Sequence, residues 1–158
     1  MGVAETILFA GDTHMNTVEI GRLNRIAERE KVNKVIQVGD FGYTFEDDFL
    51  AALERAPCPW FFIRGNHDSV TKADDGVTAL SLLKDKNIRV YTQYHEDHTN
   101  KWAFIPHYED EQRIKDYLAN VPEGYVVFGH FGYHGVLNSA GDADFELSVS
   151  DFKNPTIL

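Results

Sequence analysis

The sequence has 158 residues, of which 43% are hydrophobic and 25% charged, a globular balance in a length that fits one domain over residues 1–158. Its formal net charge of −10 at pH 7 argues against a broad basic surface that follows nucleic-acid phosphates, but leaves open a nucleic-acid substrate at a site with its own cations. A single cysteine, Cys58, excludes an internal disulfide and fits a reducing compartment.

Short apolar runs alternate with amphipathic stretches along the chain, without repeats or a linker. In chain order, the patterns predict a strand and turn over residues 6–12, a helix over 18–30, a strand over 34–40, a helix over 46–56, a strand over 60–66, a short helix over 77–85, a strand over 88–92, a polar turn over 95–101, a strand over 101–107, a helix over 109–121, a strand over 125–130 and a weakly helical segment over 146–152. The alternation predicts an α/β fold with a substantially parallel sheet. With no signal-peptide pattern and no apolar run of membrane-spanning length, we expect a cytoplasmic protein without membrane contact.

Carboxylate, imidazole and amide side chains follow four of the predicted strands, and each group of them lies next to a glycine. They are Asp12 and His14 after the first strand, Asp40 after the second, Asn66, His67 and Asp68 after the third, and His130 after the last. In open α/β sheets, ligands bind outside the carboxyl ends of the strands, so these side chains are expected at one rim.

This set of carboxylates, imidazoles and one amide, with no thiolate, suits divalent ions such as Mn, Fe, Zn or Mg rather than a structural thiolate zinc. A carboxylate between two imidazole-bearing ends can bridge a pair of metals, and such a pair activates water for phosphoryl displacement. Each motif alone is weak, because Gly-Asp is often a turn, Asn-His-Asp a helix cap and a lone histidine a buried core residue. Their joint position at strand ends favours a metal site.

The motifs "GDTH" at residues 11–14, "VGD" at 38–40, "RGNHD" at 64–68 and "FGH" at 128–130 follow one another over about 120 residues. In type, order and spacing they resemble the calcineurin-like metallophosphoesterase family. The longer stretches "VGDFGY" at residues 38–43 and "FGHFGYHG" at 128–135 resemble its small bacteriophage and bacterial members. The resemblance implies a metallophosphoesterase-type α/β/β/α sandwich. It also implies hydrolysis of a phosphomonoester or phosphodiester by a metal-bound hydroxide at a dinuclear site, with two divalent ions, Mn first and Fe, Zn, Ni or Mg as alternatives.

The resemblance also implies a role for each ligand position. Asp12 and His14 would bind the first metal, Asp40 would bridge both metals, and Asn66 and His130 would bind the second.

Three further residues of the third motif would act on the substrate. By the same resemblance, His67 would be the acid that protonates the leaving group, Asp68 would orient His67, and Arg64 would contact the phosphate. A positioned imidazole typically contributes about 10²–10⁴-fold by proton transfer.

The family's usual Gly-His-x-His motif, which completes both metal sites, does not occur in this sequence. The chain stops at "KNPTIL", which resembles the strand before that motif, so the implied sandwich would be incomplete at the C-terminus. Three explanations stay open: an N-terminal fragment, a motif on a complementary polypeptide or exchanged homo-oligomer, and a natural end with a remodelled site. His134 and His107 are weak candidates for the missing ligands, and a turn at a strand end is the simpler interpretation of His107.

Two other functions compete with a phosphoesterase that turns over a small phosphoester. One is a non-catalytic metal-binding or protein-binding scaffold that kept the fold, which the missing motif favours. The other is a nuclease, which would need a basic groove that the sequence does not show. Turnover of a chromogenic phosphodiester with excess Mn²⁺ separates the scaffold from the enzyme.

Overall fold

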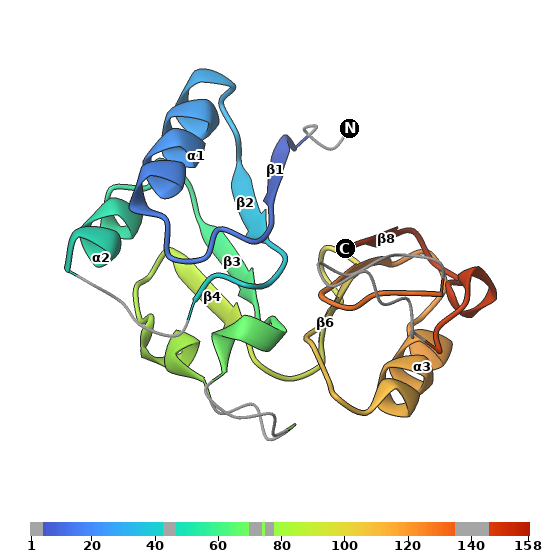
Figure 1. Ribbon diagram of the computed structural model, residues 1–158. Helices are drawn as coiled ribbons and strands as arrows, with labels where there is room; N and C mark the ends of the chain where they lie inside the picture. Colours follow the sequence, from blue (N-terminus) through green and yellow to red (C-terminus); the bar gives the residue numbers. More distant parts are fainter. Residues whose placement is uncertain (1–4, 43–46, 70–73, 75–77, 135–145) are drawn as a thin grey trace.

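Two four-stranded sheets form the centre of the molecule, shown as a computed structural model in Figure 1. The structure describes residues 5–42, 47–69, 74, 78–134 and 146–158. The first sheet is entirely parallel and has the order β1 (Ile7–Ala10), β2 (Lys34–Gln37), β3 (Trp60–Ile63) and β4 (Ile88–Tyr91). The second has the order β5 (His95–Asp97), β6 (Trp102–Ile105), β7 (Val126–Gly129) and β8 (Thr156–Ile157), with β5 antiparallel and the rest parallel.

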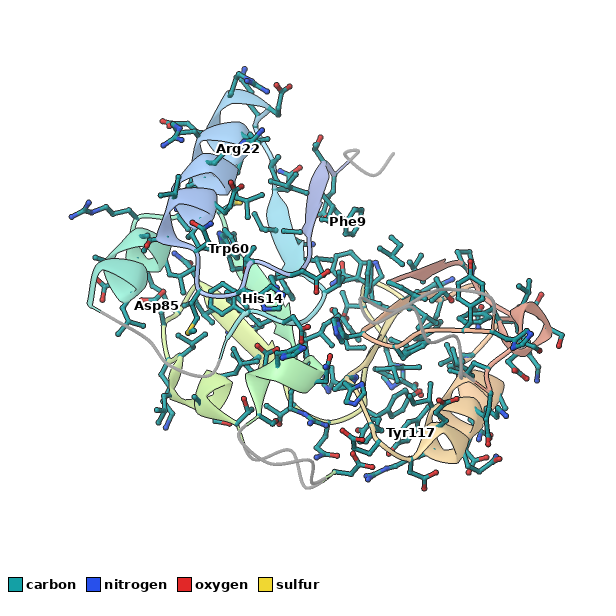
Figure 2. The ribbon with its side chains drawn as sticks, viewed as in Figure 1. Phe9, His14, Arg22, Trp60, Asp85 and Tyr117 are labelled. Carbon is teal, nitrogen blue, oxygen red and sulfur yellow. The ribbon has the colours of Figure 1, made fainter. Side chains whose placement is uncertain are left out.

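Helices cover the outer face of each sheet, on opposite sides of the molecule in Figure 1. On the first sheet, α1 (Thr17–Arg29) and α2 (Asp47–Glu54) bury residues such as Ile20 and Leu53 against Trp60, which Figure 2 labels beneath α1. On the second sheet, α3 (Glu111–Asn120) buries Ile114 and Leu118. Each apolar stripe meets one sheet face, which is how an amphipathic helix is stabilised in a layered fold.

The inner faces of the two sheets pack on each other through aromatic and branched side chains. Phe104 of β6 lies 4.0 Å from the ring of Tyr91 and 5.4 Å from that of Phe128, between ring centroids. Ile36 and Ile63 of the first sheet are fully buried in the same cluster. Strands covered on both faces read as continuous apolar runs, as "WFFI" and "WAFI" do. The predicted α/β/β/α sandwich is therefore confirmed.

The ends of the helices follow from local hydrogen bonding. The side chain of Asn16 accepts hydrogen bonds from the backbone N–H groups of Val18 and Glu19, which begins α1 one residue before the predicted start. Asp110 does the same for α3 by accepting from Gln112 N at 3.0 Å. The predicted helix starts at residues 46 and 77 lie outside the described residues.

The polar stretch 95–101 differs from the prediction of a turn alone. Its first residues form β5, which pairs with β6 so that His95 lies opposite Phe104 and stacks on Tyr91 at 4.9 Å. Asp97 accepts hydrogen bonds from the N–H groups of Thr99 and Asn100 and so starts the tight turn that follows. Side-chain packing across strands thus outweighs the polar composition of this segment.

Three short elements are 3₁₀ helices: η1 (Asn66–Asp68), η2 (Ala79–Leu82) and η3 (Val149–Asp151). The last two lie where short or weak helices were predicted. The predicted C-terminal strand is β8, which pairs in parallel with β7. No described helix is long and apolar enough to cross a membrane.

Candidate metal centre

The candidate site lies where the rims of the two sheets meet. Because β1, β2 and β3 are parallel, their carboxyl ends bring Asp12, Asp40 and Asn66 to one edge of the first sheet. The loop after β1 is hydrogen-bonded to the loop after β2, from Asp12 N to Gly39 O at 3.2 Å and from His14 N to Asp40 O at 3.0 Å. His130 follows β7 in the second sheet, and its Nδ1 lies 2.8 Å from the carbonyl oxygen of Val38 in the first. The site is therefore assembled from both sheets.

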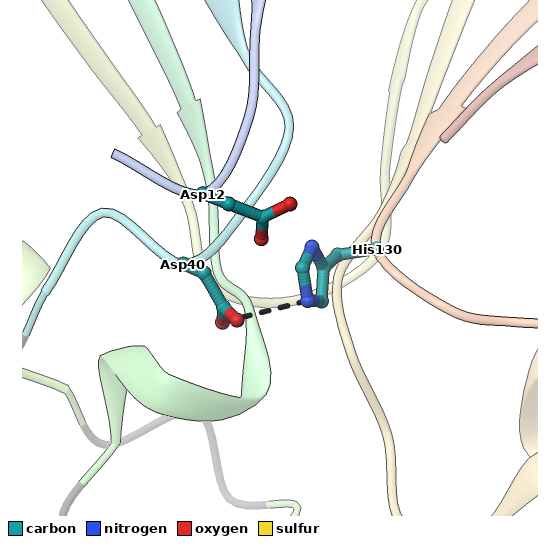
Figure 3. A group of neighbouring side chains, drawn as sticks. All are labelled: Asp12, Asp40 and His130. Carbon is teal, nitrogen blue, oxygen red and sulfur yellow. Dashed lines mark ion pairs between the residues drawn. The ribbon is translucent and has the colours of Figure 1, made fainter. Parts of the chain in front are cut away.

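Ligand-type atoms converge at this seam. Asp12, Asp40 and His130 each offer one atom, and these atoms all lie within 4.8 Å of one another. Figure 3 shows the two carboxylates on one side and the His130 ring on the other. The Nε2 atom of His130 lies 3.4 Å from Asp40 Oδ1 and 3.0 Å from the side-chain oxygen of Asn66. Asp40 is 5% exposed, whereas Asp12 and Asn66 are exposed to solvent.

The hydrogen bonding of His130 shows that these atoms fit a cation. A carbonyl oxygen only accepts hydrogen bonds, so the contact with Val38 O places a proton on Nδ1 of His130. In the neutral ring, Nε2 then carries a lone pair that faces the oxygen atoms of Asp40 and Asn66. His130 Nε2, Asp40 Oδ1 and the side-chain oxygen of Asn66 would then all point lone pairs at one another, which is unfavourable unless a proton or a metal ion lies between them.

The backbone around the site is unusual as well. Of the six non-glycine residues with positive φ in the described part of the chain, four lie in the loops after β1 and β2: Asp12, His14, Met15 and Asp40. Such conformations cost of order 1–3 kcal/mol each and persist only where the surroundings hold them. Hydrogen bonds between the two loops, including Met15 N to Phe41 O at 2.7 Å, supply that support.

A fully buried glutamine supports Gly39, the residue before Asp40. Gln37 donates from Nε2 to Gly39 O at 2.5 Å and accepts from Gly39 N at 3.0 Å. Sequence reasoning missed this residue. The signal was a glutamine inside the apolar run "KVIQV", because an amide in a core needs partners of its own.

Gly39 also makes room for His130. A Cβ at Gly39, where φ is +107°, would lie 2.1 Å from Nδ1 of His130. Gly124 has a similar φ of +81° but open space around it.

We therefore expect Gly39→Ala to displace His130 and weaken metal binding, whereas Gly124→Ala bears only the backbone strain of about 1–2 kcal/mol. The steric clash adds roughly 1–3 kcal/mol to the loss of stability in Gly39→Ala. Urea unfolding and Mn²⁺ titration of both variants measure this. Equal effects of the two substitutions would refute the role given to Gly39.

Two pKa shifts at the site, set by the protein's own groups, have a common origin. Burial by itself lowers the pKa of His130, but contacts with the Asp40 carboxylate and the Val38 carbonyl outweigh it and raise the pKa above the usual 6.5. For Asp40, burial acts to raise the pKa, and the contacts with His130 and His67 outweigh it and lower the pKa below 3.8. Protonated His130 therefore stabilises the metal-free fold below its unfolded pKa, and this contribution is lost as the pH rises through its raised folded pKa.

Metal binding is expected to release a proton from His130 at pH 6.5, because an ion takes the same Nε2 lone pair. Metal affinity should therefore fall as the pH drops through the raised pKa. Titration calorimetry with Mn²⁺ in buffers of different ionisation enthalpy measures the released proton. A heat at pH 6.5 that does not depend on the buffer would argue against His130 as a ligand.

The two exposed histidines at the rim lie close to each other. The ring of His14 lies 5.5 Å from that of His67, between centroids. His67 donates its backbone N–H to Asp40 Oδ1 at 2.9 Å, and its ring Nε2 lies 3.9 Å from Asp40 Oδ2. Among the described residues, His14 does not belong to the group formed by Asp12, Asp40 and His130. Its ring has solvent on one side and His67 on the other.

Asp68 and Arg64 have partners other than those the resemblance implies. The carboxylate of Asp68, fully buried, accepts from Gly42 N at 2.5 Å and Gly65 N at 2.7 Å. Burial raises the pKa of Asp68, and these two hydrogen bonds oppose the rise. Asp68 thus joins the loops after β2 and β3, and within the described part of the chain its side-chain bonds go to backbone rather than to the His67 ring. Arg64 is 2% exposed, and its guanidinium donates to backbone carbonyls of Thr92 and His107, which gives no support to a phosphate contact.

The two weak candidates, His107 and His134, differ in burial and in their contacts. The His107 ring lies 6.4 Å from that of His130, and its buried Nε2 has no hydrogen-bond partner among the described residues. Glu109 Oε1 lies 3.5 Å from this atom, which is an ion-pair distance. Burial lowers the pKa of His107, so its ring is neutral near pH 7. His134 is exposed and is fixed by a backbone bond to Leu147 O at 2.6 Å.

An α/β/β/α sandwich with carboxylate and imidazole groups at the seam of its sheets defines the class of metallophosphoesterases. The model of the calcineurin-like phosphoesterase family matches residues 5–154, so this chain belongs to that family and its general chemistry is metal-dependent phosphoester hydrolysis.

One solved structure is similar over 95% of this chain and 81% of its own, with a TM-score of 0.54 and 20% sequence identity. It is described as a novel archaeal phosphodiesterase, and the likeness supports the fold. A comparison with curated proteins gave no match.

Proposed function

We propose that this chain hydrolyses phosphodiesters with two divalent metal ions held at the seam of its two sheets. The observation that carries the proposal is the convergence of Asp40 Oδ1, Asn66 Oδ1 and His130 Nε2, with Asp12 alongside. Asp40 would be the residue shared by the two ions, Asp12 and His14 would hold one, and Asn66 and His130 would hold the other. Manganese is the ion we would test first, because this oxygen-rich ligand set with imidazoles suits it.

A divalent pair lowers the pKa of water and neutralises charge on the phosphoryl oxygens. The chain's own residues orient a ligand and hold the proposed general acid beside the site. His130 keeps its Nε2 lone pair toward the seam because Val38 O holds the proton on Nδ1. Asp40 accepts the N–H of His67 and so keeps that exposed imidazole beside the site.

His67 is the proposed general acid for the leaving group. Its ring is 64% exposed, so a substrate can reach it, and it lies near the buried Asp40 carboxylate. Asp68 acts on His67 indirectly. Its carboxylate accepts hydrogen bonds from Gly42 and Gly65 and so joins the loop after β2 to the loop that carries His67. A phosphodiester is preferred as the first substrate because the similar solved structure is described as a phosphodiesterase.

The test is hydrolysis of bis(p-nitrophenyl) phosphate with Mn²⁺, beside p-nitrophenyl phosphate as the monoester. We expect a rate above that of Mn²⁺ alone, lost with a chelator, and higher for the diester. A rate equal to that of free metal for both substrates, at every protein concentration tested, would contradict hydrolysis by this chain alone and favour a non-catalytic scaffold.

The source of any further ligands is part of the proposal, since the family's Gly-His-x-His motif is not in this sequence. We propose that a complementary segment or a second copy of the chain completes the site. A site completed by a second copy gives a specific activity that rises with protein concentration. A constant specific activity would mean that each chain acts alone, with His107 or His134 as the first residues to test as ligands.

A further inference from the structure

Arg64 is a charged side chain in the interior, directly beside the candidate metal centre. It follows β3 at the start of "RGNHD" and is 2% exposed. Burying a guanidinium is costly unless its donors are paired, so its partners show what the residue does. Its planar fork of donors favours acceptors in fixed positions.

The partners of Arg64 come from both sheets. Its Nε donates to Thr92 O, after β4 of the first sheet, at 3.3 Å, and its Nη2 donates to His107 O, after β6 of the second. Nη1 lies 3.4 Å from Ser69 Oγ, just after η1. The guanidinium carbon lies 5.7 Å from the centre of the Tyr108 ring. One side chain thus connects the rims of the two sheets.

A backbone hydrogen bond completes the connection in the opposite direction. His107 N donates to Arg64 O at 2.9 Å, so each of the two residues donates to the other's carbonyl oxygen. Just before His107 in the chain, β6 pairs with β7, and at the end of this pair His130 N donates to Ile105 O at 3.3 Å. A shift of the carboxyl end of β6 would therefore shift His130 as well.

We propose that Arg64 is a positioning residue that sets the distance between the ligands of the two sheets: Asp40 and Asn66 on the first, and His130 on the second. This role differs from the phosphate contact implied by the resemblance, because two of the three described guanidinium bonds of Arg64 go to backbone carbonyls and the third to Ser69 Oγ. The apolar core between the sheets sets their approximate spacing, whereas ligand atoms must be placed within roughly 0.5 Å. The proposal rests on the proposed function in that the site binds metal.

Arg64→Lys is the test, with Arg113→Lys as its matched control. Lysine keeps the charge but loses the fork that reaches both sheets. Arg113 stacks on the same Tyr108 ring, at 4.4 Å, but donates to Tyr117, Asp74 and Gln93, none of which is a candidate ligand. We expect Arg64→Lys to weaken Co²⁺ binding about tenfold or more and to shift the visible absorption of bound Co²⁺. Arg113→Lys should leave both unchanged at a comparable loss of melting temperature.

A measurement without metal keeps this inference separate from the proposed function. In the metal-free proteins at pH 8.5, nuclear magnetic resonance of the His130 ring nitrogens reports the Nδ1-protonated form held by Val38 O. We expect this signal to be preserved in Arg113→Lys and to move toward that of a free histidine in Arg64→Lys. If the wild-type protein bound no Co²⁺, the proposed function would be contradicted, and the His130 signal alone would test whether Arg64 positions His130. A His130 signal unchanged in Arg64→Lys, or Co²⁺ binding weakened equally by both variants, would overturn the proposal.

Discussion

Replacing Asp40 by asparagine is expected to remove metal-dependent hydrolysis and to weaken Mn²⁺ binding by at least about 100-fold. Loss of an outer-shell partner alone typically costs 10–100-fold, and Asp40 is proposed to contact both ions. The substitution removes the negative charge at residue 40 and keeps the shape of the side chain. Asparagine tolerates the positive φ of 55° at this position, and its side-chain oxygen can still accept the N–H of His67.

The same change alters the metal-free protein in a direction that can be checked. Without the Asp40 carboxylate, burial dominates at His130, and its pKa should fall below the raised value. Asp116→Asn is the control, because Asp116 lies exposed on α3 and, among the described residues, accepts hydrogen bonds from Gln112 and Asn120 of its own helix. Mn²⁺ titration and hydrolysis rates measure the comparison. Asp40→Asn with wild-type affinity and rate would refute the bridging role.

Replacing His67 by glutamine is expected to lower the rate strongly for one type of substrate and weakly for another. A general acid contributes about 10²–10⁴-fold where the leaving group needs a proton. An alkyl leaving group needs one, whereas p-nitrophenolate leaves readily without it. We therefore expect a loss of about 10²-fold or more for an alkyl phosphodiester and only a small loss for bis(p-nitrophenyl) phosphate.

The difference between the two substrates is what identifies proton transfer, because damage to the metal site would slow both alike. His98→Gln is the matched control. His98 is also an exposed histidine, but it lies in the turn after β5 and contacts Tyr125 OH at 2.7 Å. Rates for both substrates, with Mn²⁺ occupancy measured in parallel, complete the test. An equal loss for both substrates in His67→Gln would contradict its role as the acid.

The order of elements could be predicted from the sequence because the apolar runs are short and well separated. The runs around residues 34–40 and 60–66 contain few polar residues, since both faces of these strands are covered. Strand β5 was missed because its three residues, His95–Asp97, are all polar, and its pairing with β6 is a tertiary contact. The division into two sheets was implied by the family resemblance and not by the periodicity.

The candidate site was predicted at the level of residues, but its internal contacts were not. That Asp12, Asp40 and Asn66 lie at one rim follows from parallel strand ends, whereas His130 comes from the second sheet, which the prediction of one rim did not foresee. The contact between His130 and Val38 O depends on how two sheets pack, which local sequence does not encode. Arg64 and Asp68 show the same limit. The resemblance implies that both act on the substrate or on His67. In the structure both are buried, the described side-chain bonds of Asp68 go to backbone N–H groups, and two of the three described bonds of Arg64 go to backbone carbonyls.

The most direct test of the central claim is the number of Mn²⁺ ions bound per chain at equilibrium. Dialysis of the wild-type protein and Asp40→Asn against the same Mn²⁺ solution at pH 8, followed by elemental analysis, gives this number. Two ions per wild-type chain, with Asp40→Asn reduced to background, is the expected result. Background binding by both proteins would contradict a metal centre at the seam of the two sheets.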